Sequence, residues 1–209
     1  MVLGMMDFTD AVLIEKTLNS DEQAFAELVR RYQAAVFGTV HRLLGNSYDK
    51  EDAVQETFLR AFAALGKFDQ RYPFGPWILR IAVNYCVDQL RKRKKWKIRL
   101  WSELNDSENE RLLRDFKQDN VIESSESSDT KKYARVARSL LDGLNPKYKA
   151  AFVLREVEER GYSEVSGILG TTEIAARVRV SRARAELQKK FKAWLTGRSK
   201  EGRIKNEKL

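Results

Sequence analysis

The stretch from Tyr162 to Leu187, YSEVSGILGTTEIAARVRVSRARAEL, decides how the rest of the chain is interpreted. It predicts two helices separated by a Gly-Thr-Thr break, the second of which is rich in arginine. A helix-turn-helix places its second helix in the major groove of DNA. We therefore predict that this part of the chain binds duplex DNA.

The second of these helices has a predicted inner and outer face. Its buried stripe is Ala176, Val180, Ala183 and Leu187, at spacings of four, three and four. At about 100° per residue the opposite face shows Ala175, Val178, Ser181 and Arg182, with Arg177 and Arg179 on the flanks. Thr171 or Thr172 can cap the helix, and the free backbone N–H groups of the first helical turn could contact a phosphate.

Composition favours a polyanionic partner. The 209 residues carry a formal net charge of +9, although charge alone does not separate DNA, RNA and anionic membranes. The single Cys86 excludes an internal disulfide or a cysteine zinc cluster, and the single His41 excludes a histidine metal site, so we expect no cofactor. No apolar run approaches a span of ~20 residues and no signal peptide is evident, so we expect a cytoplasmic protein without membrane insertion.

Apolar spacing predicts an all-α fold, because apolar residues recur at three and four rather than alternating. We expect a short helix over 11–18, then a long one capped by Ser20 or Asp21 and stopped at Gly45. A third helix, capped by Ser47 or Asp49, would bury a stripe of Val54, Phe58, Ala61, Phe62 and Leu65. A fourth opens at Trp77, a fifth spans 133–141, and a sixth starts at Asn145-Pro146 with Ala150, Phe152, Val153 and Val157 facing inward.

Charge divides the chain into modules. Residues 91–99, RKRKKWKIR, hold seven basic side chains, whereas residues 102–130 hold nine acidic and three basic ones. From residue 131 to 209 there are twenty basic and nine acidic side chains. We predict two small helical domains, over 10–99 and 131–195, joined by a flexible acidic linker over 100–130 and followed by a frayed basic tail over 196–209.

A group of aromatic residues lies beside the basic run. They are Tyr72, Phe74, Trp77 and Tyr85, in and just after the loop KFDQRYPFGP. Each alone suits a hydrophobic core, but together they resemble a surface for single-stranded nucleic acid, since aromatic faces stack on unpaired bases.

Two blocks of the chain resemble a known family. DEQAFAELVRRY, YDKEDAVQETFLRAF and FGPWILRIAVNYCVDQLRKRKK look like region 2 of the sigma-70 superfamily of RNA polymerase sigma factors, and LNPKYKAAFVLREVEERGYSEVSGILG with RVRVSRARAEL is similar to region 4. The resemblance covers about residues 10–195, in the right order. It is to the small two-domain extracytoplasmic-function (ECF) group.

The resemblance implies roles for individual residues. Those matching the reader of the minus-35 promoter element are Thr172, Arg177, Val178, Arg179, Ser181 and Arg182. Those matching the minus-10 surface, which captures a flipped base and the opened strand, are Asp69, Tyr72, Phe74, Trp77, Arg80, Asn84, Asp88, Arg91 and Arg93. Those matching the polymerase-docking helix are Asp52, Gln55 and Glu56. Arginine suits guanine, and Val178 could meet a thymine methyl group.

The resemblance also implies partners. These are promoter DNA, core RNA polymerase (the clamp helices of its largest subunit and the flap of the second-largest) and an anti-sigma protein. The acidic linker would occupy the polymerase cleft and RNA exit channel as a nucleic-acid mimic. A flexible linker leaves the two domains free to sit differently in the free, inhibited and polymerase-bound forms.

The chain departs from the family pattern at the front of the recognition helix. Ile174-Ala175-Ala176 stands where members often carry Gly-Thr-Val, Arg160-Gly161 replaces a Ser/Gly-type lead-in, and Ser181 replaces an aromatic residue or histidine.

Two other functions stay open. One is a transcriptional regulator that binds duplex DNA without polymerase. The other is an enzyme using the acidic residues of the third helix, which no catalytic constellation supports.

Overall fold

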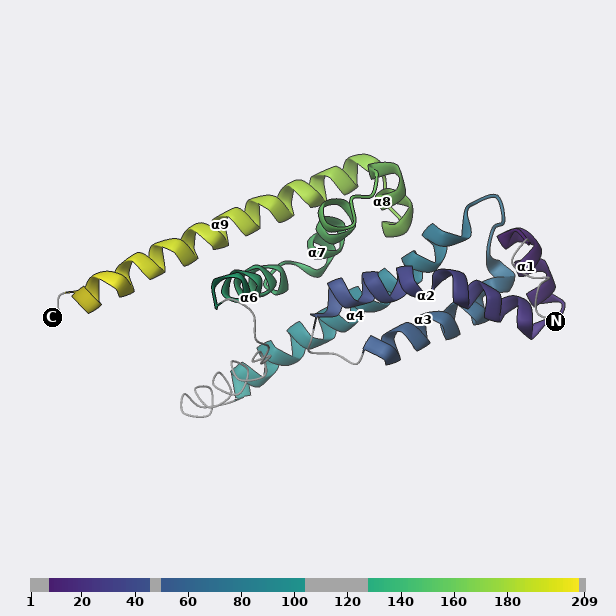
Figure 1. The fold of residues 1–209 in the computed structure, drawn as a ribbon, viewed down its shortest axis with the longest axis horizontal. Coiled ribbons are helices and arrows are strands. Elements are labelled where there is room, and N and C mark those ends of the chain that lie inside the picture. Colours follow the sequence, from purple (N-terminus) through teal and green to yellow (C-terminus); the bar gives the residue numbers. More distant parts are fainter. Residues whose placement is uncertain (1–7, 46–49, 104–127, 207–209) are drawn as a thin grey trace.

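The computed structural model describes residues 8–45, 50–103 and 128–206, and within these ranges every regular element is helical (Figure 1). The helices are Asp10–Leu18 (α1), Glu22–Leu44 (α2), Lys50–Ala64 (α3), Phe74–Glu103 (α4), Ser128–Asp142 (α6), Pro146–Phe152 (α7), Tyr162–Leu169 (α8) and Glu173–Asn206 (α9). A 3-10 turn, Leu65–Lys67, follows α3, and a π-helical segment, Val153–Val157, follows α7. The all-α prediction is confirmed.

Side-chain caps set several helix starts. The Asp21 carboxylate accepts two backbone N–H groups of the first turn of α2, at 3.1 and 3.2 Å. Asn145 accepts one at the start of α7, where Pro146 occupies the first helical position and has no N–H to satisfy. These caps agree with the sequence. The predicted caps of α3, Ser47 or Asp49, lie outside the described residues.

The N-terminal module, α1–α4, packs around the long helix α2. Along one face of α2, four apolar side chains are fully buried: Leu28, Val36, Val40 and Leu43. Phe62 of α3 was predicted to be buried as well, but its side chain is 53% exposed. It packs edge-on against Phe25, with ring centroids 4.9 Å apart, and lies with Leu59 on the side of α3 that lines an open groove.

The C-terminal module, α6–α9, lies against the N-terminal one. Figure 1 shows α7 and α8 beside α2 and α4, and α8 makes its main contacts outside its own module with α4. Val153, Leu154, Val165 and Ile168 join the same buried cluster as the core residues of α2 and α4. The two modules therefore share one continuous hydrophobic core.

Three further predictions differ from the structure. Helix α4 begins at Phe74 rather than Trp77, because a proline is tolerated in a first helical turn and the Phe74 ring is anchored in the core. Val157, predicted to face inward, is exposed because the π-helical segment changes which residues share a face. The basic tail expected to be frayed is instead the end of α9, which continues to Asn206. Most of the predicted linker, 104–127, lies outside the described residues.

Candidate nucleic-acid and polymerase interfaces

The predicted helix-turn-helix is formed by α8, a turn and α9. Gly170 ends α8 in the left-handed conformation (φ 57°, ψ 48°), which glycine adopts without a steric penalty. Thr172 then caps α9, since its hydroxyl accepts the backbone N–H of Ala175 at 3.2 Å. Ala176 and Val180 hold α9 against the module core. Of the two caps open on sequence grounds, Thr172 is the one used.

The outward face of α9 carries the residues predicted to read DNA. Arg177, Val178, Ser181 and Arg182 are all exposed, whereas Arg179 is half-buried and donates to the Thr171 hydroxyl at 3.5 Å. Ahead of them Ile174 is 76% exposed, so an apolar side chain projects at the front of the helix. The structure therefore presents the predicted set together on one surface.

Several of the α9 arginines are held by side chains that the sequence prediction did not single out. The contacts are Arg182 Nη1 to the Tyr148 hydroxyl (3.0 Å), Arg184 Nη2 to Glu156 Oε1 (2.8 Å), and the Arg177 guanidinium over the Tyr162 ring (4.1 Å to the centroid). These partners come from α7, the π-helical segment and α8. The tyrosines at the starts of α7 and α8 are a visible sequence signal, but only the fold brings them to α9.

The predicted minus-10 loop is partly exposed and partly core. The Arg71 guanidinium holds the pKa of the Asp69 carboxyl below its usual value, through hydrogen bonds as short as 2.6 Å. Tyr72 is 65% exposed. Phe74 is only 2% exposed, so its assignment as a base-stacking residue is wrong for this structure: its ring fills the space beside Tyr32 beneath the loop. Trp77 is half-buried and packs on neighbouring aromatic rings.

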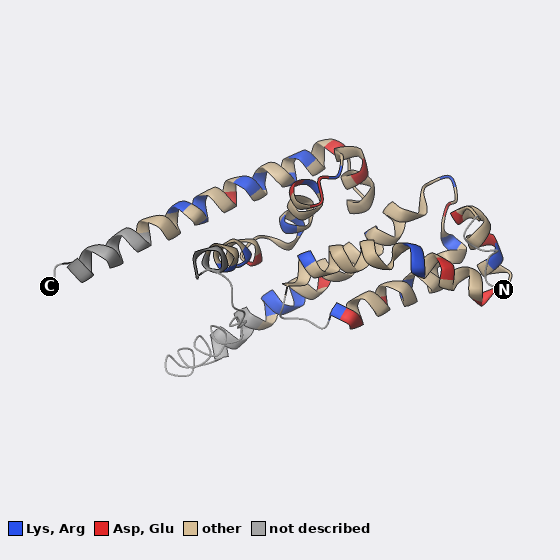
Figure 2. Ribbon diagram, in the orientation of Figure 1, with Lys and Arg blue, Asp and Glu red and all other residues tan. Residues whose placement is uncertain are grey.

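One face of α4 continues from this loop. Arg80, Asn84, Asp88 and Arg91 are exposed at spacings of four, four and three, which place them along one side of the helix. Asp88 and Arg91 form an ion pair at 3.0 Å, and Arg93 is half-buried. Figure 2 shows further Lys and Arg residues on the second half of α4 and along α9.

The two predicted DNA-reading surfaces meet in this structure. The Arg80 guanidinium lies so close to Gly170, in the turn of the helix-turn-helix, that a Cβ atom there would overlap it. At another point of the boundary, the Glu158 carboxylate, which is nearly buried, accepts from the hydroxyl of Thr39 in α2 at 2.9 Å and forms a 3.4 Å ion pair with Arg42. These polar contacts add to the shared core in joining the modules.

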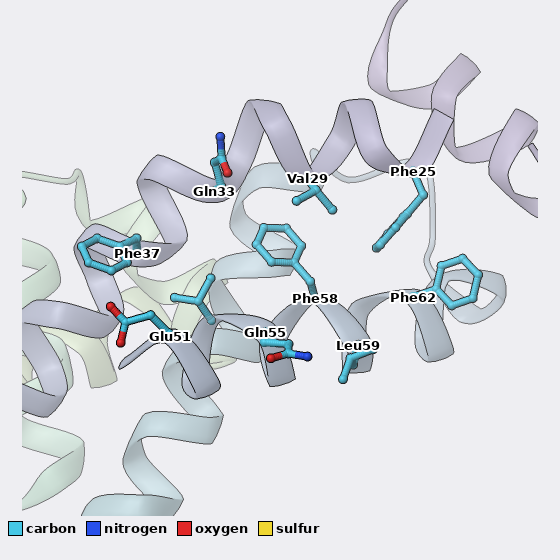
Figure 3. A pocket seen from close by; sticks show the side chains of 10 residues that line it. Phe25, Val29, Gln33, Phe37, Glu51, Gln55, Phe58, Leu59 and Phe62 are labelled. Carbon is cyan, nitrogen blue, oxygen red and sulfur yellow. The ribbon is translucent and has the colours of Figure 1, made fainter. Parts of the chain in front are cut away.

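The predicted polymerase-docking face lies on α3. Asp52 and Gln55 are exposed, and Glu56 is half-buried and paired with Arg60 at 2.7 Å. Beside them α2 and α3 enclose an apolar groove of about 560 Å³, which Gln55 also lines (Figure 3). Its apolar walls are mainly Phe25, Val29, Phe37, Val54, Leu59 and Phe62. The sequence prediction missed this groove, although an apolar Leu59 outside the buried stripe was a signal for it.

Two negative observations apply to the described part of the chain. Within it, no helix is both long enough and apolar enough to cross a membrane. The same residues bring together no group of three His, Cys, Asp or Glu side chains that could hold a metal ion.

Comparison with known proteins identifies the family. Residues 28–96 match the model of Sigma-70 region 2, and residues 134–187 match that of Sigma-70 region 4. The ECF RNA polymerase sigma-E factor of Haemophilus influenzae is 30% identical over 187 residues, which cover 88% of this chain and 95% of that protein. The chain belongs to the ECF RNA polymerase sigma factors. Like them, this sigma factor binds core RNA polymerase and directs promoter-specific initiation of transcription.

Further relatives agree with this assignment. The ECF sigma factor SigW of Bacillus subtilis is 28% identical over 179 residues, covering 86% of this sigma factor and 95% of SigW. Among solved structures, CnrH in complex with the cytosolic domain of CnrY superposes with a TM-score of 0.57 at 25% identity, covering 88% of this chain and 97% of CnrH. The sigma factor RpoE of Bartonella quintana, solved with the anti-sigma factor NepR, has the same fold (TM-score 0.52, 23% identity, 80% and 96% coverage).

Proposed function

We propose that α9 reads the minus-35 element of the promoter. The exposed Arg177, Val178, Ser181 and Arg182 supply the direct base contacts, since arginine pairs with the acceptors of guanine and valine fits a thymine methyl group. Arg179 and the helix start at Thr172 contact phosphates. The observation that carries this proposal is the exposure of these side chains on one face of a capped helix, with Arg177 and Arg182 already held in place.

The minus-10 element is opened and held by the loop before α4 and by the exposed face of α4. Asp69 and Tyr72 contact the flipped base with Trp77 beside them, and Phe74 supports the loop from within the core. The strand then follows the α4 residues, in the order Arg80, Asn84, Asp88, Arg91 and Arg93. Flipping a base costs a few kcal/mol. Stacking of the base on an aromatic ring, at about 1–3 kcal/mol per base, and neutralisation of phosphates by basic side chains offset this cost.

Core polymerase docks on α3. Asp52, Gln55 and Glu56 form the polar edge of this surface, and the neighbouring groove receives apolar side chains of the clamp helices of the largest subunit. The flap of the second-largest subunit contacts the C-terminal module. The sigma factor has no catalytic role of its own and needs no cofactor, because polymerase performs the chemistry. It acts in the cytoplasm, where polymerase works.

An anti-sigma protein regulates this sigma factor. Support comes from two similar structures, CnrH and RpoE, which were solved with the proteins CnrY and NepR bound. The apolar groove between α2 and α3 is already accessible in the closed arrangement of the modules, so a partner can engage it without separating them.

The closed arrangement has to open during initiation. Elements centred near positions −35 and −10 are about 25 base pairs apart, or about 85 Å of straight B-form DNA at about 3.4 Å per base pair. Here Arg80 of the minus-10 face touches Gly170 of the helix-turn-helix. Surfaces in contact cannot read sites that far apart, so polymerase binds the sigma factor with its modules separated.

The test is transcription in vitro with core RNA polymerase and promoters selected from a randomised pool. Specific run-off transcripts that require the sigma factor are expected, and their absence would refute the proposal. Arg182→Ala should lose discrimination at one or two minus-35 positions. A uniform loss across sequences would instead mean that Arg182 contacts only phosphate. Sequence-specific binding to duplex DNA without polymerase would favour the regulator alternative.

A further inference from the structure

Tyr162, the first residue of α8, occupies a position that the promoter-reading residues do not explain. Its ring is partly buried and packs against the core that joins the two modules, so packing limits its movement. Its backbone begins the helix after Gly161, whose missing side chain leaves the first turn without a side-chain cap. The ring is thus a rigid surface at the edge of the helix-turn-helix.

Two guanidinium groups lie over this ring. The Arg177 guanidinium carbon is 4.1 Å from the ring centroid and that of Arg155 is 5.0 Å from it, both inside the distance at which a cation and an aromatic face attract each other. Arg155 is itself held, because it donates from Nη1 to the carbonyl of Arg160 at 2.9 Å. Arg177 is the cation of the pair that projects from the DNA-facing side of α9.

The Arg177 guanidinium lies closer to its ring than that of Arg182, whose carbon is 6.0 Å from the centroid of the Tyr148 ring. Arg182 and Arg184 each donate an N–H to a protein oxygen, at 3.0 and 2.8 Å. The Glu173 carboxylate is 3.8 Å from Nη2 of Arg177, beyond hydrogen-bond range. The N–H donors of a guanidinium lie in its plane, so a ring that holds its face leaves those donors for a ligand.

We propose that Tyr162 is a positioning residue for promoter recognition: its ring holds the face of Arg177 so that the N–H edge is presented to a guanine of the minus-35 element. This inference rests on the proposed base-reading role of Arg177. Holding a long side chain in advance lowers the entropic cost of ordering it on DNA. Tyr162 therefore strengthens discrimination between bases without contacting a base.

The experiment weakens the ring electronically while keeping its shape. Holoenzyme is assembled from core polymerase and full-length sigma factor carrying, at position 162, phenylalanine or its mono-, di- or trifluorinated analogues, which progressively reduce the negative charge on the ring face. Initiation rates are compared on the selected promoter and on templates with each other base at the position that Arg177→Ala identifies. Discrimination at that position should fall stepwise, by about threefold to tenfold across the series.

Two controls separate positioning from folding. In an Arg177→Ala background the fluorination series should have no effect on discrimination, because the cation is absent. Tyr148→Phe removes the hydroxyl that accepts from Arg182, so it should alter discrimination at a different base and leave the Arg177 position unchanged. A series that leaves discrimination constant in the presence of Arg177 would overturn the positioning role.

The failure of the two proposals can be told apart. If Arg177→Ala changes no base preference, Arg177 does not read a base, and the positioning role of Tyr162 is overturned with it. If Arg177→Ala abolishes one preference while the fluorinated variants keep it in full, the reading role stands and only the inference about Tyr162 is refuted. Tyr162→Leu, compared with phenylalanine for thermal stability, reports how much of any loss comes from the fold.

Discussion

Replacing Thr39 with valine should shift the sigma factor from its closed to its open form. Thr39 is fully buried in α2, and its hydroxyl donates across the module boundary to the Glu158 carboxylate at 2.9 Å. Valine keeps the size and branching of threonine but cannot donate. The substitution therefore removes a bond between the modules while leaving the rest of α2 in place.

The expected shift follows from the strength of that bond. A hydrogen bond to a charged group contributes about 1.5–3 kcal/mol, and removal of the buried hydroxyl recovers part of this because valine needs no partner. A net loss of about 1.4 kcal/mol would lower the ratio of closed to open molecules about tenfold. The open form lacks the Thr39–Glu158 bond, so its free energy does not change through this contact.

Single-molecule fluorescence between the modules would measure this ratio. Dyes on cysteines introduced at the exposed positions Ala34 and Lys189, in a Cys86→Ala background, report the separation of α2 and α9. Thr57→Val is the matched control: Thr57 is equally buried, but its hydroxyl donates at 2.7 Å to a carbonyl within α3. An unchanged ratio in Thr39→Val, or an equal change in Thr57→Val, would refute the reasoning.

Three further outcomes are expected. Glu159→Gly should raise the free energy of unfolding by about 1 kcal/mol in chemical denaturation, because Glu159 has a φ of 57°, where glycine is unstrained; a destabilised variant would contradict this. Hydrogen bonds from Arg30 and Arg31 lower the pKa of Glu27 to about 2, so this stabilisation is present above the ordinary value of 4.5 and is lost as pH falls from 4.5 through 2. Glu27→Gln should therefore be less stable at pH 7 and lose less stability over that window, and equal acid sensitivity would count against the pair. Leu59→Asp, at a 58% exposed position in the groove, should weaken binding to core polymerase about tenfold in titrations without lowering the melting temperature, and unchanged affinity would remove the groove from the interface.

Local features of the fold could be predicted well from sequence. The caps at Asp21, Asn145 and Thr172 depend on residues two or three positions away. Spacing alone also predicted that Ala176, Val180 and Ala183 are buried, whereas Leu187, the last residue of that stripe, is half-buried. Features that depend on packing between residues far apart in the sequence could not be predicted. Periodicity assigned Phe62 and Val157 to the core, but Phe62 lines the open groove and the π-helical segment turns Val157 outward, so both are exposed.

The candidate sites divide in the same way. Residues on one helix face, such as Asn84 and Arg91, are exposed as a set because helix geometry places them together. The burial of Phe74 could not be predicted from sequence. Its position two residues after the exposed Tyr72 does not indicate that its ring fills the space beneath the loop. The contact between Arg80 and Gly170 joins residues 90 positions apart, and no local pattern in the sequence indicates it.

The shared core has a consequence for how the molecule melts. Because Val165 and Ile168 of the helix-turn-helix are buried together with side chains of α2 and α4, neither module can unfold in the closed form without exposing apolar surface of the other. Calorimetry of the closed chain should then give one cooperative transition. Once the modules separate, the small C-terminal module loses part of its core and should melt independently, at a lower temperature than the N-terminal one. Cooperativity of unfolding is thus a property of the arrangement of the modules as well as of the modules themselves.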